Sequence, residues 1–125
     1  MTETVAYPGD KQAIYTRILA AIDRETARIN AVADEIHANP ELGMEEFKAS
    51  ALMTETISRY GYEVERGTGG IATAFKAIRG GRGSGPAIAF LAEYDALPGL
   101  GHGCGHNLIA SSNLAAAIGL GEVIA

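Results

Sequence analysis

Cysteine and tryptophan are the scarcest residues of this 125-residue sequence: Cys104 is its only cysteine, and tryptophan does not occur. A single cysteine cannot form an internal disulfide, which excludes a small secreted scaffold held together by such bonds. Basic residues are also few, with ten Lys and Arg against fifteen Asp and Glu and a net charge of −5. This balance excludes the broad basic surface that nucleic-acid binding needs. Residues 1–12 lack the basic and apolar regions of a signal peptide, which predicts a cytoplasmic protein.

Positive charge is absent from the last third of the chain. No Lys or Arg follows Arg82, and residues 83–125 carry three acidic side chains, Glu93, Asp95 and Glu122. Such a segment suits a bound cation better than an anion, although a buried segment with no need for charge has the same composition. Glycine, in contrast, is abundant, with 16 residues gathered mainly around positions 67–70, 80–85, 99–105 and 119–121.

The first half of the sequence predicts two helices and two strands. Isoleucine and valine recur at helical spacing from about residue 10 to 38, and Asn39-Pro40 ends this first helix. A second helix is expected from about 44 to 60, ended by Gly61. Alternating side chains at 62–65 and the segment 71–78 predict two strands joined by a glycine-rich turn.

The second half predicts a strand, a loop and a helix. Residues 86–92 form an unbroken apolar run, as expected for a central strand covered on both faces. A glycine-rich loop, 99–105, leads to a helix of small residues from about 107 to the end, which Asn107 or Ser111 could cap. Polar residues in this helix favour a buried helix over a membrane span, and we expect no contact with a membrane. This unit is half of a βαβ motif and places the chain in the α/β class.

Metal-ligating residue types gather behind the predicted central strand. In open α/β sheets, ligands bind beyond the carboxyl ends of the strands. Cys, His and carboxylate side chains are ligands of cations such as Zn²⁺, and Cys104 precedes a helix N-terminus that would stabilise its thiolate. The residues of this constellation are Glu93, Asp95, His102, Cys104 and His106.

Two other interpretations of these residues stay open. The loop could be a glycine-rich turn with a buried cysteine and two surface histidines. Alternatively, Cys104 could be a nucleophile activated by His106 or His102. For His37, at the end of the first helix, a structural role near the helix dipole is favoured.

The number of ligands limits what the chain can do by itself. A catalytic zinc takes three protein ligands and keeps an open position, and a two-metal site needs more. Three histidines and one cysteine barely serve one metal, and the sequence stops inside an apolar helix without a capping signal. We therefore expect residues 1–125 to be the N-terminal part of a longer enzyme, inactive alone.

Two linked motifs carry a resemblance to a known family. Ala92-Glu93-Tyr94-Asp95-Ala96-Leu97-Pro98, followed by Gly101-His102-Gly103-Cys104-Gly105-His106-Asn107, resembles the metal-site signature of the aminoacylase and glutamate-carboxypeptidase metallopeptidase superfamily. The match is to its amidohydrolase branch, and it resembles most the aminobenzoyl-glutamate hydrolase and dipeptidase-like members. The segment 37–41 with Glu46 also fits that branch, so the resemblance covers residues from about 25 to the end.

The resemblance implies a site and an activity. Cys104 and His106 match a pair of metal ligands, and Asp95 matches the aspartate that orients a ligand; no role carries over for Glu93, His102 or His37. The implied fold is a larger α/β catalytic domain, whose other ligands, general base and inserted dimerisation domain would lie beyond residue 125. The implied reaction is metal-dependent hydrolysis of an amide joining an acyl group to an amino acid, with two Zn or Mn ions in the complete site of a homodimer.

The substrate is not readable from the residues that are present. N-acyl amino acids, aminobenzoyl-glutamate and dipeptides are the classes that the resemblance implies. An alternative from a different functional class is a non-catalytic module of the same fold, with a metal-binding or regulatory role.

Overall fold

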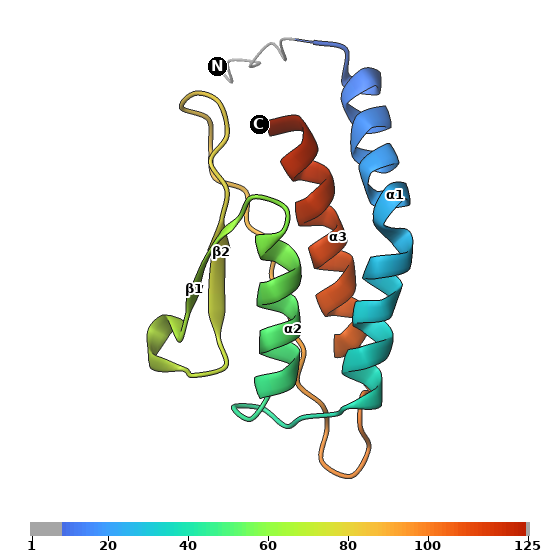
Figure 1. The fold of residues 1–125 in the computed structure, drawn as a ribbon, viewed down its shortest axis with the longest axis vertical. Coiled ribbons are helices and arrows are strands. Elements are labelled where there is room, and N and C mark those ends of the chain that lie inside the picture. The colour runs from blue at the N-terminus through green and yellow to red at the C-terminus, as the bar shows by residue number, and fades with distance from the viewer. Residues whose placement is uncertain (1–8, 125) are drawn as a thin grey trace, which may run out of the picture.

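The computed structural model describes residues 9–124, which form three helices and one small sheet. Residues 1–8, part of the segment in which no signal peptide is expected, lie outside the described residues. The elements follow in the order α1, α2, β1, η1, β2 and α3 (Figure 1). Their bounds are Lys11–Ala38 for α1, Phe47–Ser58 for α2, Glu63–Arg66 for β1, Thr68–Gly70 for the 3₁₀ turn η1, Phe75–Ile78 for β2 and His106–Ile124 for α3.

The long first helix is confirmed, and both of its ends have a clear cause. The Asp10 carboxylate accepts a hydrogen bond from the backbone N–H of Gln12 at 2.9 Å, which satisfies one of the free donors of the first turn. At the other end the N–H of Asn39 still reaches the carbonyl of Glu35, at 3.2 Å. Pro40 then prevents the helix from continuing.

Helix α2 begins at residue 47, three residues later than expected, because the chain turns tightly before it. Met44 has a φ of +71°, the only positive value among the non-glycine residues of the described part. The Glu46 carboxylate accepts a hydrogen bond from the Met44 N–H at 2.9 Å and so stabilises this turn. The Glu41 carboxylate caps the helix, since it accepts from the N–H groups of Lys48 at 3.0 Å and Ala49 at 2.8 Å.

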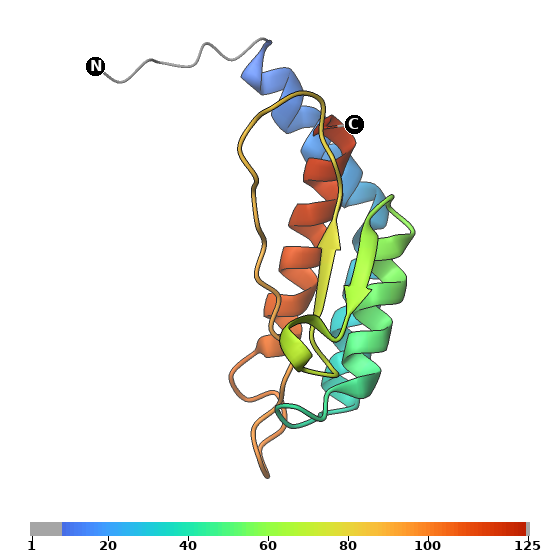
Figure 2. The same cartoon turned by 90° about the vertical axis from the view of Figure 1, so that its left-hand side faces the viewer.

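The two strands form an antiparallel hairpin that packs beside α2. Glu63 pairs with Ile78 and Arg66 pairs with Phe75. The first strand lies about where it was expected, at 62–65. The second is shorter than the expected 71–78, because the chain bends at residues 71–74, where the N–H of Ala74 binds the carbonyl of Ile71 at 3.0 Å. Figure 2 shows the hairpin as a separate layer over the helices.

The prediction of a central strand at residues 86–92 is wrong: within residues 9–124, this segment forms no strand. These residues have no strand assignment, and residues 86–91 are exposed, with Leu91 79% and Ile88 63% accessible. In Figure 2 this segment runs as an extended coil from the hairpin to the loop before α3. An apolar run indicates burial but does not supply the neighbouring strands that must pair with it. The described residues combine helices with one two-stranded sheet, which is compatible with the α/β class. The larger α/β catalytic domain stays a prediction.

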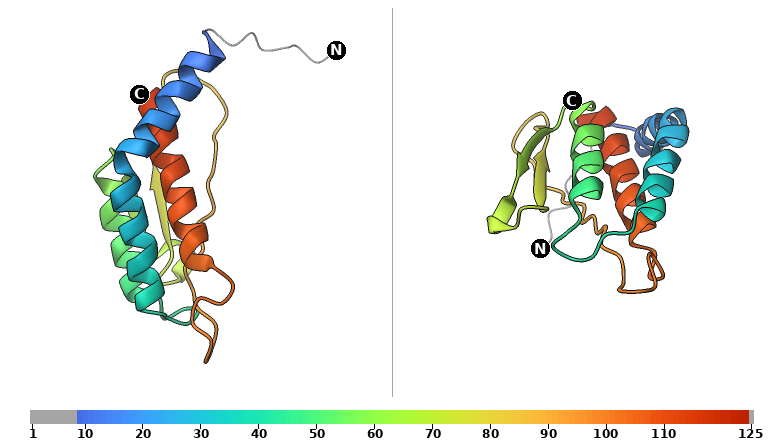
Figure 3. Two further views of the ribbon diagram at one scale, coloured as in Figure 1. Left: turned by 90° about the vertical axis from the view of Figure 1, so that its right-hand side faces the viewer. Right: turned by 60° about the horizontal axis from the view of Figure 1, so that its bottom comes forward.

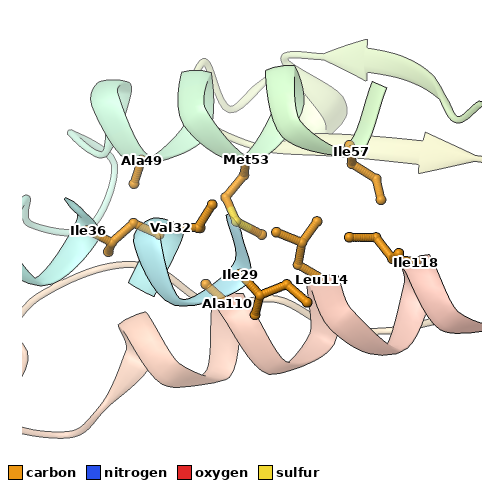
Figure 4. Packing of buried hydrophobic residues seen from close by; sticks show 9 residues of the cluster. All are labelled: Ile29, Val32, Ile36, Ala49, Met53, Ile57, Ala110, Leu114 and Ile118. Carbon is orange, nitrogen blue, oxygen red and sulfur yellow. The ribbon is translucent and has the colours of Figure 1, made fainter. Parts of the chain in front are cut away.

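The core lies between the three helices, as Figure 4 shows. Figure 3 shows α3 running along α1 for much of its length. The nine buried residues of the cluster are Ile29, Val32 and Ile36 of α1, Ala49, Met53 and Ile57 of α2, and Ala110, Leu114 and Ile118 of α3. Of the helices among residues 9–124, α3 alone is long and apolar enough to cross a membrane by length and composition. It contributes Ala110, Leu114 and Ile118 to the buried cluster, and 39% of its apolar window is buried.

Candidate metal centre

The loop that carries the candidate ligands is folded by its glycines. Gly99, Gly101 and Gly105 have φ values of +69°, +66° and +77°, which other residues adopt rarely. The N–H of Leu97 binds the carbonyl of Gly101 at 2.8 Å, and the reverse bond is 3.1 Å long. The predicted glycine-rich loop is thus confirmed. It lies at the end of the helix bundle where α1 ends and α3 begins (Figure 1).

The loop is fixed to the start of α2 through Glu41. The carbonyl of Glu41 accepts a hydrogen bond from the N–H of Ala96 at 2.7 Å, and Leu42 forms a parallel bridge with Ala96. Ala96 is only 4% exposed. Glu41 therefore holds the residue that follows Asp95 with its backbone, while its carboxylate caps α2.

Helix α3 starts at His106, one residue before the expected start, and neither expected cap is a cap. Asn107 is buried and donates from Nδ2 to the carbonyl of Ala33 on α1 at 3.2 Å. Ser111 lies inside the helix and donates to the carbonyl of Leu108 at 3.2 Å. Asn107 instead joins α3 to α1, which places His106 at a fixed end of the bundle.

Two carboxylates flank the imidazole of His106. Nδ1 lies 2.7 Å from Oδ1 of Asp95 and 3.1 Å from the Asp95 backbone oxygen. On the other side of the ring, Nε2 lies 3.1 Å from Oε2 of Glu93. The His106 side chain is 22% exposed, against 39% for Asp95 and 56% for Glu93. The structure thus joins His106 to Asp95, as the resemblance implies, and also to Glu93, which sequence reasoning left without a role.

The pairing with Asp95 determines the state of the ring. Both atoms next to Nδ1 are hydrogen-bond acceptors, a carboxylate oxygen and a carbonyl oxygen, so Nδ1 carries a proton and donates it. Such a carboxylate–imidazole bond is the usual way in which the other nitrogen, Nε2, is oriented and made more basic for a metal. In this respect His106, with Asp95 behind it, fits a metal ligand.

Cys104 is placed differently. It is a free thiol on the exposed surface of the loop, which contradicts the interpretation as a turn with a buried cysteine. Among residues 9–124, no three His, Cys, Asp or Glu side chains are gathered into a metal site. The residues present therefore fit part of a metal centre, formed by His106 with its two carboxylates. Cys104, two residues before His106, stays a predicted ligand.

His102 lies on the inner side of the loop, against the end of α1. Its ring is 6.3 Å from that of His37, which is in the last turn of α1. Both ring nitrogens of His102 are buried beside the backbone of Ile36. Burial lowers the pKa of His102 below its ordinary value, and His37 and His106 add to this shift. In the described part of the chain, no hydrogen bond joins the Cys104 thiol to His102 or His106, the two bases considered for a cysteine nucleophile.

Several polar side chains around the site were missed by the sequence analysis. The Tyr94 hydroxyl donates to the carbonyl of Thr73 at 2.5 Å, and the Thr73 hydroxyl donates to the buried Glu46 carboxylate at 2.6 Å. This chain of contacts joins the segment between Glu93 and Asp95 to the hairpin and to the turn before α2. In the sequence, the position of Tyr94 between Glu93 and Asp95 was the only indication of these contacts.

Glu122, the only acidic residue after the loop, lies away from the site. It forms an ion pair with Arg24 at 3.4 Å, and its carbonyl accepts from Arg17 at 2.8 Å. Both partners belong to α1. Glu122 therefore fastens the far end of α3 to α1.

The chain is similar to curated enzymes of one chemical class. It is 39% identical over 124 residues to one of the subunits of p-aminobenzoyl-glutamate hydrolase from Escherichia coli, a match that covers 86% of this chain and 25% of that protein. Identity to the Xaa-Arg dipeptidase of Mus musculus is 37% over 138 residues, covering 96% of this chain and 31% of the relative. Identity to N-acetyl-L-cysteine deacetylase of Bacillus subtilis is 34% over 101 residues, with 70% and 24% covered. No family model matches the chain.

These similarities support the resemblance drawn from the motifs at the level of the superfamily: the chain is similar to amidohydrolases and peptidases. It spans about a quarter to a third of the length of these relatives. What the whole protein does is therefore a matter of proposal.

Proposed function

We propose that the protein hydrolyses the amide bond between an acyl group and an amino acid in a small molecule, with the help of a divalent metal. The observation that carries this proposal is the orientation of His106 by Asp95, at 2.7 Å, on a glycine-folded loop. The names of the relatives described above indicate substrates of this kind: an aminobenzoyl-glutamate, an Xaa-Arg dipeptide and an N-acetyl-cysteine.

The chain's own residues have distinct tasks in this proposal. Asp95 holds the proton on Nδ1 of His106, so that the lone pair of Nε2 faces outward from the ring. His106 and Cys104 would hold the metal. When bound, the metal lowers the pKa of a water molecule toward neutrality and polarises the carbonyl of the amide. Tyr94 and Glu41 keep the loop in place from the two sides.

Finer features stay predictions that rest on the family resemblance. These are two metal ions, zinc or manganese, in each complete site, a homodimer, a cytoplasmic location and no contact with a membrane. Residues 1–125 would be the N-terminal part of the catalytic domain.

The test is hydrolysis and metal binding by the full-length protein that contains this sequence. The protein is stripped with a chelator and assayed with Zn²⁺ or Mn²⁺ on aminobenzoyl-glutamate, a dipeptide with C-terminal arginine, and N-acetyl-cysteine. We expect turnover of at least one of them that depends on the added metal. Metal binding without turnover of any acyl amino acid or dipeptide would favour the non-catalytic module instead.

The ligands are tested separately by elemental analysis of two variants. Cys104→Ala and His106→Ala should each lower the amount of bound metal, because each removes a donor atom. Asp34→Ala, a change of an exposed residue on α1, is the control and should keep the metal content of the parent. Full metal retention in both ligand variants would overturn the assignment.

A further inference from the structure

The contact between Glu93 and His106 is not used by the proposal above. Oε2 of Glu93 lies 3.1 Å from Nε2 of His106, the ring nitrogen that would face a metal. Glu93 stands two residues before Asp95, so alternate residues of one extended segment place their carboxylates at the two nitrogens of one imidazole.

The chemistry of the two facing atoms is unusual. Because Nδ1 donates its proton to the side chain and backbone oxygens of Asp95, Nε2 of a neutral imidazole carries a lone pair. The Glu93 carboxylate also offers only lone pairs. Two acceptors 3.1 Å apart repel each other unless a positive species, a proton or a metal ion, lies between them or is bound by both.

The spacing agrees with shared binding of one ion. Metal–nitrogen and metal–oxygen distances of about 2.0–2.2 Å with a tetrahedral angle put two ligand atoms about 3.3–3.5 Å apart. The observed separation differs from this by only a few tenths of an ångström. The Glu93 side chain is also 56% exposed, so a small rotation is enough to adjust it.

We propose that Glu93 is a metal ligand that binds the same divalent cation as His106 through Oε2. This inference rests on the proposed metal dependence of the site. It adds a ligand from the extended segment before the loop to the predicted pair, Cys104 and His106. With Asp95 behind the ring, three protein ligands then come from residues 93–106, which is the number that a catalytic zinc takes.

The experiment measures the affinity of the metal-free, full-length protein for Zn²⁺ by competition with a chelating indicator. Glu93→Gln keeps the size of the side chain and removes its charge and most of its ability to bind a cation. Loss of a residue that only hydrogen-bonds to a metal ligand typically costs about 10–100-fold in affinity. Because Glu93 would bind the metal directly, we expect Glu93→Gln to lower the Zn²⁺ affinity by about 10-fold or more. The control is Glu63→Gln, which makes the same chemical change at an exposed position of β1 and should leave the affinity unchanged.

A second readout reports on the metal itself. Co²⁺ in place of Zn²⁺ gives a visible absorption spectrum that depends on the number and type of ligands, and we expect Glu93→Gln to change it. Unchanged affinity and an unchanged Co²⁺ spectrum would overturn the inference. Tighter Zn²⁺ binding by Glu93→Gln would also overturn it, since Glu93 would then compete with the metal for His106. Thermal unfolding of the metal-free variants confirms that each is folded.

Failure of this inference is distinguishable from failure of the proposed function. If the parent hydrolyses an acyl amino acid while Glu93→Gln binds Zn²⁺ as the parent does, the function stands and Glu93 is no ligand. If the affinity depends on Glu93 but the parent hydrolyses none of the substrates, the ligand assignment stands without the function.

Discussion

Replacing Asp95 by asparagine separates the orientation of His106 from the stability of the fold. The Oδ1–Nδ1 distance of 2.7 Å is that of a hydrogen bond to a charged acceptor, which is roughly twice as strong as one between neutral groups. Asparagine keeps an oxygen that can accept from Nδ1 but loses the negative charge that strengthens this hydrogen bond. We therefore expect Asp95→Asn to weaken metal binding about 10–100-fold, or about 1.4–2.8 kcal/mol.

The effect of Asp95→Asn on folding should be much smaller. The Asp95 side chain is 39% exposed, and partly exposed ion pairs contribute about 0–1 kcal/mol. A loss of this size shifts the melting temperature of a protein of a few hundred residues by about 2–4 °C or less. The assay compares Zn²⁺ affinity, turnover and melting temperature of Asp95→Asn with those of Asp34→Asn, an exposed change on α1. Unchanged affinity and turnover in Asp95→Asn, or a large drop in melting temperature alone, would refute the reasoning.

Two further predictions concern stability. A Cβ atom at Gly119 would lie 2.9 Å from Cγ2 of Ile18, so the overpacking cost of about 1–3 kcal/mol outweighs the gain in helix propensity of about 1 kcal/mol. Gly119→Ala should thus lower the free energy of unfolding in urea, whereas Ser112→Ala on the exposed side of the same helix should not; a more stable Gly119→Ala would contradict this packing. Burial and a hydrogen bond to Glu25 raise the pKa of Tyr60 above 10.0, so its contribution to stability is present below pH 10 and is lost as the pH rises through the raised pKa. Unfolding free energies measured on both sides of pH 10 should fall less steeply in Tyr60→Phe than in the parent, and equal slopes would count against the assignment.

The helices were predictable because their signals are local. Asp10 and Asn39-Pro40 mark the ends of α1 in the sequence itself, and the isoleucine spacing gives its buried face. The structure of residues 86–92 was not predictable in this way. A run of apolar residues is equally compatible with a paired strand and with an exposed segment. Strand formation depends on neighbours that are far away in the sequence or outside it.

The candidate site was predictable in its residues and only partly in its geometry. The spacing of Cys104 and His106 and the residue types around them identified the loop, and the family resemblance implied the role of Asp95. The contact between Glu93 and His106 joins residues thirteen positions apart, and only the folded loop shows that it forms. Asn107 shows the same limit, since an asparagine at a helix start predicts a cap, whereas here packing turns it toward α1.

The double attachment of Glu41 has a mechanical consequence. Its carboxylate is bonded to the first turn of α2, and its carbonyl is bonded to Ala96, the residue after Asp95. A tilt or translation of α2 is therefore transmitted through one residue to the carboxylate that aims the His106 ring. The position of that ring and the position of α2 are not independent, so a contact on the surface of α2 could alter the aim of Nε2 without touching the loop.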